Sequence, residues 1–448
     1  MTINLDLHSI IFTFAPSGSG KSFFCKNHLI KTLNCQYPLA KVLYLSSDDI
    51  RNSILKANHH KYDGIMSTVS GETFKKILSD AAIASTYPNN FEFIIIDTTG
   101  LDINFMKSID GIAKQNNYKT HCLAFDYAVE EYYKFNDLEY NNCKSIIDSH
   151  INKFNKYKSN IYADNVNVIK NKDFSCIDIQ VNKYDEYKKC NIESFDDTLI
   201  IGDIHFCYDE LKEMLSKKYS KFIFVGDLID KGYAGKETIE FLHDKLINEP
   251  DKYKSVIGNH ESYVYKRLTG EIRASAGEDI NFNSIQLFQE DESLKQKFMD
   301  IVNIQLPFIK SNSVIVTHAP CENKYLGKLD NKSTKAQRNF RFARYADFND
   351  YELWTNRLAK DFSFLVTESN NSYPLHIFGH CGVQTYLRHL NKICVDSGCV
   401  NGSQLVGISI NNSNHIEFQS VLVESVKSTT NVKITQYSKG LETIFYKI

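Results

Sequence analysis

Short hydrophobic runs alternate with longer polar, helix-forming segments in the first third of the chain. These runs are Ile10–Phe14, Val42–Leu45, Phe93–Ile96, Cys122–Phe125 and Val166–Ile169. Runs of this length separated by helical segments are typical of βαβ units, because parallel strands need a long crossover between them. The pattern therefore predicts an α/β domain over residues 1–172, with a parallel sheet flanked by helices.

The alternation breaks between residues 173 and 195, where the sequence is charged and weakly periodic. From Thr198 a second series of strand-like runs begins, and most of them end in Asp, Asn or His. These runs are TLIIGD, KFIFVGD, KSVIGNH, SVIVTH, LHIFGH, KICVDSG and LVGISI. Side chains at the carboxyl ends of sheet strands converge on one site in open α/β folds. We therefore expect a linker at 173–195 and a second α/β domain at 196–448.

The bulk composition allows ordinary globular domains and gives no global sign of nucleic-acid binding. Of 448 residues, 42% are hydrophobic, and the formal net charge is −2. The net charge does not exclude a local basic groove that binds nucleic acid, because such binding depends on where the charges lie. Eleven Cys residues form no CxxC pair, which favours reduced thiols and a cytoplasmic protein. The N-terminus lacks the basic region of a signal peptide, and no apolar stretch is long enough to span a membrane.

A glycine-rich segment, APSGSGKS at 15–22, follows the first hydrophobic run and precedes a helix-forming segment. It is a P-loop pattern with Ala15 in place of the first glycine, and it predicts binding of ATP and Mg²⁺. Backbone N–H groups of such a loop surround a phosphate, the lysine reaches the β- and γ-phosphates, and the final hydroxyl binds Mg²⁺. The expected ligands are Ser17, Gly18, Ser19, Gly20, Lys21 and, for the metal, Ser22. A plain Gly/Ser-rich turn is the alternative.

Acidic residues follow the next two hydrophobic runs. Asp97, after Phe93–Ile96, is expected to hold the water shell of the metal, as a Walker-B-like carboxylate. In SSDDIR, Asp48 is expected to accept the proton of an attacking hydroxyl, and Arg51 to grip an acceptor phosphate. Asp49 is the rival base. A helix N-cap is the alternative for each of the three acids.

The segment Lys61–Gly64 matches KxDG, the lysine motif of adenylyl-transferring ligases. It lies between the P-loop and the Asp97 strand, with no nucleotidyltransferase domain around it. So short a pattern matches easily by chance, and we interpret it as coincidence.

The C-terminal runs carry acidic, amide and imidazole side chains that suit a pair of divalent metals. The segments are GDIH, GDLIDKG, GNHE, VTHAP and FGH, in that order. One metal is expected to bind Asp203, His205 and Asp227. The other is expected to bind Asp227, Asn259, His318 and His380. A pair bridged by one carboxylate acidifies a water and clamps phosphate oxygens, so this half is predicted to be a phosphoesterase.

His260 is expected to act as the general acid for the leaving oxygen, oriented by Asp230. Lys231 would contact the phosphate. A buried, hydrogen-bonded imidazole is the alternative for any single His, but five segments that agree in order and spacing favour the metal site.

With both sites, the chain resembles the bacterial polynucleotide kinase-phosphatase family of RNA-end-healing enzymes. SGSGKS, SSDDIR and IIIDTTG are similar to its kinase domain. GDIHFCYDEL, GDLIDKG, GNHE, RNFRFARYADF and ICVDSGCVNGSQLVGI are similar to its phosphatase. The resemblance covers most of residues 10–410. It implies a P-loop NTPase-type polynucleotide kinase domain at 1–172 and a calcineurin-like metallophosphoesterase α/β sandwich at 196–448.

The resemblance implies two activities on broken RNA, tRNA included. The kinase would transfer the ATP γ-phosphate to a 5′-OH end, and the phosphatase would remove 2′-phosphate, 3′-phosphate or 2′,3′-cyclic phosphate. The family's metal is Mn²⁺, although the ligand set alone would also accept Fe, Ni or Zn. The family's ligase module has no counterpart here, so sealing would need a separate ligase in trans.

The sequence departs from the family at several positions. The lid stretch VEEYYKFNDLEYNNCKS has no arginine; Lys134 or Lys144 would substitute, but lysine cannot form the bidentate contact. Lys231, Phe206 and Gly100 stand where the family has Arg, Gly and Asn. Phe206 is expected to narrow the mouth of the metal site.

Three further points leave alternatives open. Arg341 and Arg344 are candidate contacts for a substrate phosphate or ordinary surface arginines. The GDxH, GDxxD and GNHE series is shared with Ser/Thr-type protein phosphatases, which gives a second function. The missing lid arginines give a third, in which the N-terminal domain senses ATP and regulates the phosphatase.

Overall fold

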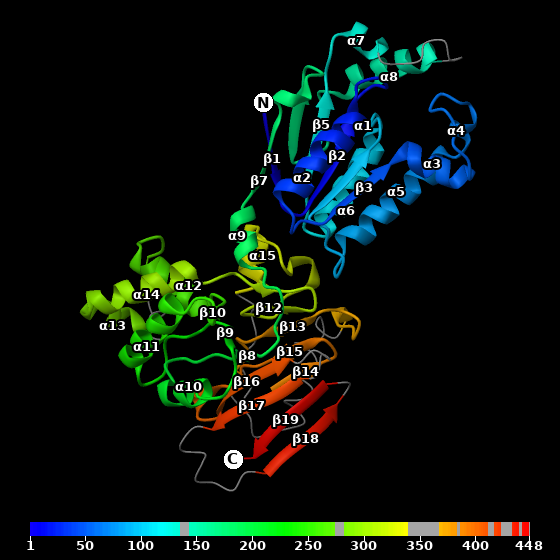
Figure 1. The fold of residues 1–448 in the computed structure, drawn as a ribbon. Helices are drawn as coiled ribbons and strands as arrows, with labels where there is room; N and C mark the ends of the chain where they lie inside the picture. Colours follow the sequence, from blue (N-terminus) through cyan, green and yellow to red (C-terminus); the bar gives the residue numbers. More distant parts are fainter. Residues whose placement is uncertain are drawn as a thin grey trace. The chain divides into compact units, whose positions relative to one another are not determined.

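The computed structural model describes residues 1–134, 143–273, 282–338, 367–382, 386–410, 416–422, 432–438 and 441–447. The chain divides into two compact units, Met1–Lys188 and Lys189–Ile448 (Figure 1). Their boundary falls inside the segment 173–195, but this segment is not an irregular linker. Strand β7 (Asp178–Asn182) pairs in parallel with β1 (Thr2–Asp6), and helix α9 (Tyr184–Lys189) follows. Apolar Ile179 and Val181 alternate with polar residues along β7, which is the pattern of a half-buried strand. The linker prediction was based on the charge of the segment and did not take this alternation into account.

The five hydrophobic runs of the first unit form one parallel sheet, as predicted. Its strand order is β3-β4-β2-β5-β6. The strands are β2 (Ser9–Phe14), β3 (Val42–Ser46), β4 (Phe93–Asp97), β5 (Lys119–Phe125) and β6 (Asn165–Ile169). Every residue of β2 is buried, which suits a continuous apolar run in the middle of a covered sheet.

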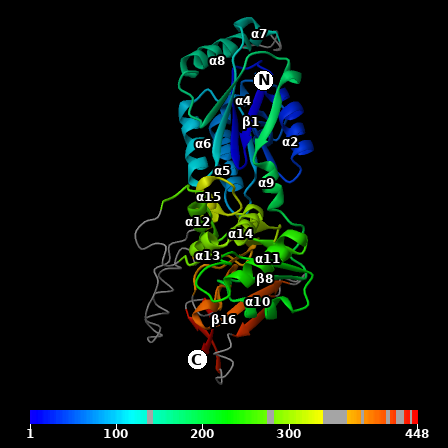
Figure 2. The same cartoon turned by 90° about the vertical axis from the view of Figure 1, so that its left-hand side faces the viewer.

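Helices cover both faces of this sheet. The helices are α1 (Lys21–Phe24), a π-helical turn (Cys25–Leu29), α2 (Ile30–Gln36), α3 (Ser47–Leu55), α4 (Ile65–Thr68), α5 (Ser70–Ser85), α6 (Ile103–Gln115), α7 (Val129–Tyr133) and α8 (Cys143–Tyr157). Figure 2 shows α2 and α6 on opposite sides of the sheet. The connections from β2 and from its neighbour β4 therefore leave on opposite faces. A crevice forms at such a switch point, where α/β sheets bind ligands.

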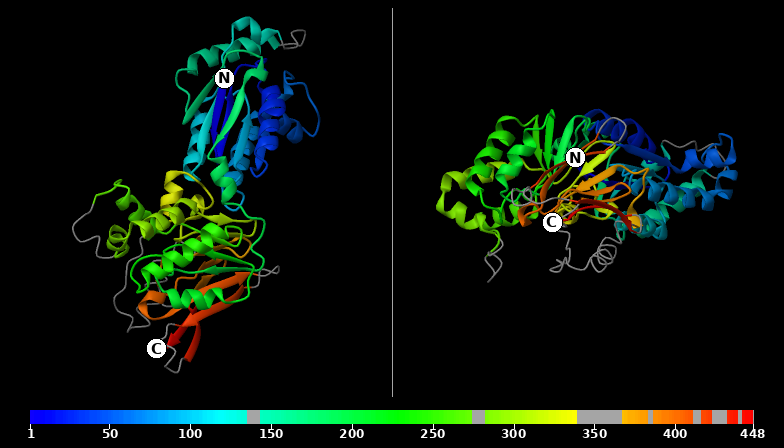
Figure 3. Two further views of the ribbon diagram at one scale, coloured as in Figure 1. Left: turned by 60° about the vertical axis from the view of Figure 1, so that its left-hand side comes forward. Right: turned by 90° about the horizontal axis from the view of Figure 1, so that it is seen from below.

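The second unit contains two sheets. One has the order β10-β9-β8-β16-β17 and the other β11-β12-β13-β15-β14-β19-β18. The strands are β8 (Thr198–Ile201), β9 (Lys221–Phe224), β10 (Tyr253–Ser255), β11 (Ile309–Lys310), β12 (Val314–Val316), β13 (Leu375–Phe378), β14 (Tyr386–His389), β15 (Lys392–Cys394), β16 (Gln404–Ile410), β17 (Ile416–Leu422), β18 (Val432–Ser438) and β19 (Leu441–Lys447). Each of the seven strand-like runs predicted for this half includes all or part of a strand. The hairpin of β18 and β19, red in Figure 3, extends the second sheet at its edge.

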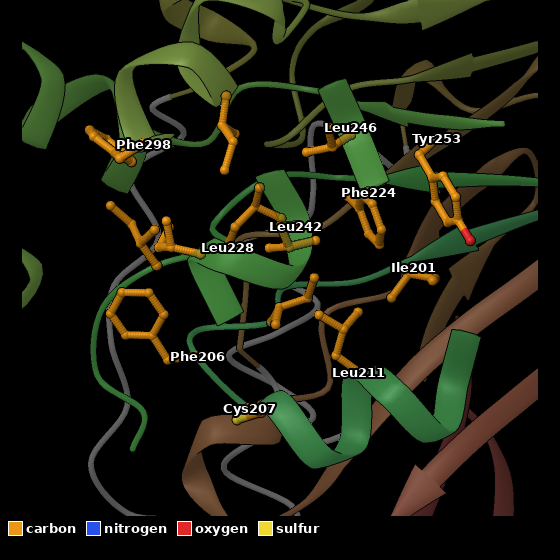
Figure 4. Packing of buried hydrophobic residues seen from close by; sticks show 14 of the residues in the cluster. Ile201, Phe206, Cys207, Leu211, Phe224, Leu228, Leu242, Leu246, Tyr253 and Phe298 are labelled. Atoms are coloured by element: carbon orange, nitrogen blue, oxygen red, sulfur yellow. The ribbon is translucent and has the colours of Figure 1, made fainter. Parts of the chain in front are cut away.

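Two hydrophobic cores hold this unit together. Buried residues of both sheets, among them Ile200, Val225 and Ile377, form one core. The other lies beneath helices and contains Phe206, Leu211 and Leu242 (Figure 4). The helices of the unit are α10 (Tyr208–Leu215), α11 (Gly235–Asn248), α12 (Asn259–Leu268), α13 (Ser284–Glu290), α14 (Glu292–Ile304) and α15 (Asn331–Ala336). Within the described ranges, none of the helices is long and apolar enough to span a membrane.

Candidate functional site

A cavity of about 490 Å³ lies at the carboxyl end of the first unit's sheet. The predicted residues that line it are Ser17, Gly18, Gly20, Lys21, Ser22, Asp48, Arg51 and Asp97. Ser19 is fully buried and does not line the cavity. The crossover between β2 and β4 thus brings together residues separated by up to 80 positions, which is the arrangement that the sequence predicts.

The loop after β2 contains two glycines with a positive φ, Gly18 and Gly20. Gly20, the N-cap of α1, has φ +78°, a left-handed conformation that a side chain would strain. The N–H of Ala15 donates to the Thr99 carbonyl at 2.9 Å. Ala15 itself does not adopt a positive φ, so alanine is tolerated where the pattern has its first glycine.

Asp48 rather than Asp49 faces the cavity. The Asp48 carboxylate accepts a hydrogen bond from the Arg51 guanidinium at 2.9 Å, and Arg51 also packs over the Phe74 ring. Asp49 instead pairs with Lys26 at 3.2 Å and does not line this cavity. The N-cap of α3 is Ser46, so neither acid has the capping role that was the alternative. The Nε of Arg51 is buried and has no hydrogen-bond partner among the residues that the structure covers.

Asp97 lies at the end of β4 and is almost fully buried. Tyr44 donates its hydroxyl hydrogen to one carboxylate oxygen at 2.6 Å, and the other oxygen is without a partner in the described ranges. A buried carboxylate oxygen without a donor is costly, and a water of a bound Mg²⁺ would satisfy it. The residues present therefore fit a nucleotide-bound Mg²⁺.

The segment Lys61–Gly64 also lines the cavity, a placement that its sequence pattern does not predict. It adds the cation of Lys61 to a cavity wall that also includes Lys21 and Arg51. Unlike Lys61, neither of the two lid lysines, Lys134 and Lys144, lines the cavity. Lys134 instead pairs with Glu131. The rest of the lid, residues 135–142, lies outside the described residues.

His150 of α8 joins the cavity wall and was missed by the sequence analysis. Its Nδ1 lies 3.0 Å from the Ser17 hydroxyl. Burial, with the nearby cations Lys21, Lys153 and Arg51, lowers the pKa of His150 to about 4. His150 belongs to no recognised motif, so the sequence did not mark it as a site residue.

We expect the protein to lose stability as the pH falls from about 6.5 towards 4, because the unfolded chain protonates His150 in this window and the folded chain does not. The contribution is roughly 3 kcal/mol or less. Urea unfolding followed by circular dichroism at pH 7 and pH 5 checks this. The variant His150→Gln should lose less stability than the wild type between the two pH values, and an equal loss in both proteins would contradict the assignment.

A second candidate site lies in the other unit, at the ends of β8, β9, β12 and β13. Asp227 is at its centre, with one carboxylate oxygen 3.4 Å from His318 Nε2 and the other 3.7 Å from His205 Nε2 and 3.9 Å from His260 Nε2. Burial by itself raises the pKa of Asp227, but His318, His260 and His205 outweigh it and hold that pKa below its ordinary value. The bridging ligand predicted from the sequence thus has imidazoles on both sides.

Two groups of metal-ligating atoms share Asp227. One is His205, Asp227 and His260, and the other is Asp227, His318 and His380; within each group the ligand atoms lie within 4.8 Å of one another. The Asn259 side-chain oxygen lies 2.9 Å from His318 Nε2, and His380 Nδ1 lies 3.2 Å from the same atom. This mixed oxygen and nitrogen donor set fits a pair of divalent cations.

His205 and His318 favour the neutral form that binds metals. Burial and the Lys231 ammonium lower the pKa of His205 well below its ordinary value, and burial lowers the pKa of His318 to about 4. His205 Nδ1 donates to the Ile229 carbonyl at 2.7 Å and His318 Nδ1 to the Val225 carbonyl at 3.0 Å, which directs each Nε2 towards Asp227.

Asp203 is buried beside this cluster, but it is not part of either three-ligand group. Both of its carboxylate oxygens accept the backbone N–H of His380, at 3.0 and 3.1 Å. A Cβ on Gly379 would lie 2.0 Å from the same carboxylate, so only glycine fits there. Burial and the neighbouring carboxylates Asp396 and Asp227 raise the pKa of Asp203, which shows how closely the negative charges are packed.

His260 lies beside Asp230 and also belongs to one of the two groups of metal-ligating residues. Its Nδ1 lies 2.7 Å from Asp230, whose other oxygen accepts the Ser284 N–H at 2.9 Å. This pairing orients the ring with Nε2 towards Asp227. His260 therefore combines the geometry of a general acid with membership of a ligand group. Lys231 lies 2.8 Å from His205 Nε2.

The sequence analysis missed the roles of Glu261 and Asp396. The fully buried Glu261 carboxylate accepts N–H bonds from Asp227, Leu228, Ile229 and Gly258, at 2.6 to 3.3 Å. It thereby fixes the loop that carries Asp227. Asp396 is buried near Asp203 and accepts the Gly398 N–H at 3.0 Å. The position of Asp396 directly after the hydrophobic residues of the KICVDSG run was the signal in the sequence that could have identified it.

The expectation for Phe206 is wrong. Its side chain is 1% exposed and lies in the hydrophobic core beneath the helices rather than at the mouth of the site (Figure 4). Its φ is +60°, where glycine is favoured, and the apolar contacts of the ring offset the backbone strain. Arg341 and Arg344 lie outside the described residues.

Comparison with known proteins agrees with this second site. Residues 197–400 match the model of the calcineurin-like phosphoesterase family. The C-terminal half is therefore a calcineurin-like metallophosphoesterase domain, and the chain is a metal-dependent phosphoesterase. Among curated proteins, it is similar to the bis(5′-nucleosyl)-tetraphosphatase PrpE [asymmetrical] of Bacillus subtilis, with 25% identity over 227 residues, 46% of this chain and 88% of that protein. The protein of the same name from Anoxybacillus flavithermus is 27% identical over 235 residues, 47% of this chain and 88% of that protein.

Solved structures give weaker likenesses. A metallophosphoesterase from Sphaerobacter thermophilus has a TM-score of 0.33 and 15% identity over 52% of this chain and 90% of that one. A gluconokinase from Sinorhizobium meliloti 1021 has a TM-score of 0.25 and 9% identity over 37% of this chain and 84% of that one.

Proposed function

We propose that the chain is a bifunctional nucleic-acid end-healing enzyme: a 5′-OH polynucleotide kinase joined to a phosphatase for 2′-phosphate, 3′-phosphate or 2′,3′-cyclic phosphate ends. The observation that carries the proposal is the first unit's cavity. It combines a glycine-rich loop, Lys21, the Asp48–Arg51 pair and Asp97 in the same chain as a metal-dependent phosphoesterase. The proposed substrate class is a broken RNA strand, whose two ends need opposite phosphate chemistry.

In the kinase half, the loop N–H groups and Lys21 hold the ATP phosphates, and Ser22 and Asp97 hold Mg²⁺ and its waters. The Mg²⁺ that Ser22 and Asp97 would hold would supply positive charge to the phosphate oxygens. Asp48 accepts the proton of the 5′-hydroxyl as it attacks the γ-phosphorus, and ADP leaves. Arg51 keeps Asp48 in place and has further donors for an acceptor phosphate.

In the phosphatase half, the proposed metal ligands are Asp203, His205, Asp227, Asn259, His318 and His380. When bound there, two divalent cations, Mn²⁺ by resemblance, would supply an activated water and positive charge for the phosphate oxygens. His260, oriented by Asp230, donates a proton to the leaving oxygen. Lys231 turns from His205 to the substrate phosphate. A separate ligase seals the healed ends.

A second candidate for the phosphatase substrate comes from the PrpE proteins, whose name describes cleavage of dinucleoside tetraphosphates. Both substrates present a phosphate ester next to a nucleoside. The metal cluster by itself does not distinguish them, because it acts on the phosphorus. A phosphopeptide, the kind of substrate that Ser/Thr protein phosphatases use, is the third candidate substrate.

The test uses the full chain with Mg²⁺ and Mn²⁺. It is incubated with γ-labelled ATP and 5′-OH RNA, 5′-OH DNA or a nicked tRNA, with Lys21→Ala as the control. Label should transfer to RNA only with Lys21 present. No transfer, with phosphatase activity intact, overturns the kinase half. ATP that changes the phosphatase rate without being consumed would support a sensing domain instead.

The phosphatase half is tested by kcat/KM on RNA with a 2′,3′-cyclic phosphate end, diadenosine tetraphosphate and a phosphoserine peptide. We expect the RNA end to be the best of the three. A clear preference for the tetraphosphate would assign the site to free dinucleotides, and a preference for the peptide to protein dephosphorylation.

A further inference from the structure

A group of soft and acidic ligands lies in the second unit, outside the cluster around Asp227. It consists of Cys207, Glu210 and Cys399. Their two sulfurs and one carboxylate oxygen lie within 4.8 Å of one another. All three residues are buried, with exposed fractions of 3%, 6% and 3%. The phosphoesterase mechanism uses none of them.

The fold brings these ligands together from two places. Cys207, labelled in Figure 4, is the N-cap of α10. Glu210 follows three residues later in the first turn of the helix, so both residues project from the same turn. Cys399 begins the 3-10 turn Cys399–Asn401, just after the buried Asp396.

The donor set selects the kind of metal. Two thiolates and a carboxylate are ligands of Zn²⁺, with bonds of about 2.3 Å to sulfur and about 2.0–2.2 Å to oxygen. Tetrahedral bonds of those lengths separate neighbouring ligand atoms by roughly 3.5–3.8 Å, which is inside the observed limit of 4.8 Å. Mn²⁺ and Mg²⁺ prefer oxygen ligands, so the two kinds of site would select different cations.

A second interaction supports a ligand role for Glu210. The Tyr233 hydroxyl donates to its carboxylate at 3.0 Å. Metal-binding carboxylates are commonly held in this way by a hydrogen-bond donor outside the coordination shell.

The pair Cys381 and Cys394 provides an internal comparison. Their thiols also interact with each other, but they belong to no three-ligand group in the part of the chain that the structure describes. The difference is that Glu210 places a carboxylate oxygen within 4.8 Å of both sulfurs. Adjacent buried cysteines therefore do not suffice to define the cluster.

We propose that Cys207, Glu210 and Cys399 bind one Zn²⁺ ion, separate from the cations at the phosphoesterase site. The ion would tie the start of α10, which follows the loop of His205, to the turn that follows Asp396. Its role is to hold these two loops in place, since all three ligands are buried and no substrate reaches them.

Cobalt substitution tests the proposal without depending on any enzyme activity. The full chain is stripped of metal and loaded with Co²⁺, which takes zinc sites and absorbs in the near ultraviolet when bound by thiolates. The two ligand groups that share Asp227 contain no cysteine, so cobalt bound by them gives no such band. We expect the wild type to show the band and to bind one more equivalent of metal than Cys399→Ser, which should lose the band.

Two further variants keep the result interpretable. Cys35→Ser, at an exposed cysteine, should keep the band and the metal content. Glu210→Gln retains both thiols and nearly the same volume, and should weaken cobalt binding at this site at least tenfold. Absence of the band in the wild type, or its persistence in Cys399→Ser, overturns the proposal. If Cys399→Ser does not fold, an unchanged cobalt affinity in Glu210→Gln overturns it.

Discussion

Replacing Asp227 with Asn should abolish the phosphoesterase activity and leave nucleotide binding by the first unit unchanged. Asp227 is the one residue common to both ligand groups, and its carboxylate has His205 on one side and His318 on the other. The amide has nearly the same shape but no charge, so it loses a bridging position between two cations. We expect kcat/KM on a phosphate ester to fall by about 10³-fold or more.

Steady-state hydrolysis of a chromogenic phosphodiester, together with metal content by elemental analysis, measures the effect of Asp227→Asn. Asp244→Asn is the matched control, because Asp244 is an exposed carboxylate on α11 and contacts no member of the cluster. The loss should be accompanied by fewer bound cations. Full activity with a normal metal content would mean that Asp227 is not a bridge.

The second large effect is expected for Lys21→Ala in the first unit. Lys21 is the first residue of α1, lines the cavity and lies directly after the left-handed Gly20. Removal of its ammonium takes away the charge that faces the transferred phosphate. Label transfer from ATP to 5′-OH RNA should fall by about 10²–10³-fold or more, whereas phosphoesterase activity should be unchanged.

Lys31→Ala is the control for this variant, since Lys31 is an exposed lysine on the following α2 helix and does not line the cavity. Transfer is measured as labelled RNA and hydrolysis on the same preparation. A variant that lost both activities would contradict the independence of the two sites. Equal transfer by Lys21→Ala and the wild type would remove Lys21 from the proposed mechanism.

The strands and the loops that follow them were predictable because each signal is local. Short apolar runs specify buried strands, and a polar side chain directly after a run lies at the sheet's carboxyl edge. That rule found Asp97, Asp227 and His318 without any knowledge of strand order. The apolar alternation in β7 was a weaker signal of the same kind.

Other features depend on contacts between distant parts of the chain. Glu261 stands beside the predicted Asn259 and His260, but its hydrogen bonds to the Asp227 loop exist only because α12 packs against that loop. His150 reaches Ser17 across 133 positions. Phe206 follows a site residue in sequence, yet its backbone turns the ring into the core. No periodicity or motif encodes such directions.

The sequence by itself determined the two α/β halves, the glycine-rich loop and the ordered set of acidic, amide and imidazole residues, because spacing along the strand is enough to place them at a sheet edge. Only the tertiary structure decided that Asp48, and not Asp49, faces the cavity, that Lys61–Gly64 forms part of its wall, and that Cys207 and Cys399 meet at Glu210. These outcomes depend on which helix face packs inward and which turns approach one another, and those are long-range properties of the folded chain.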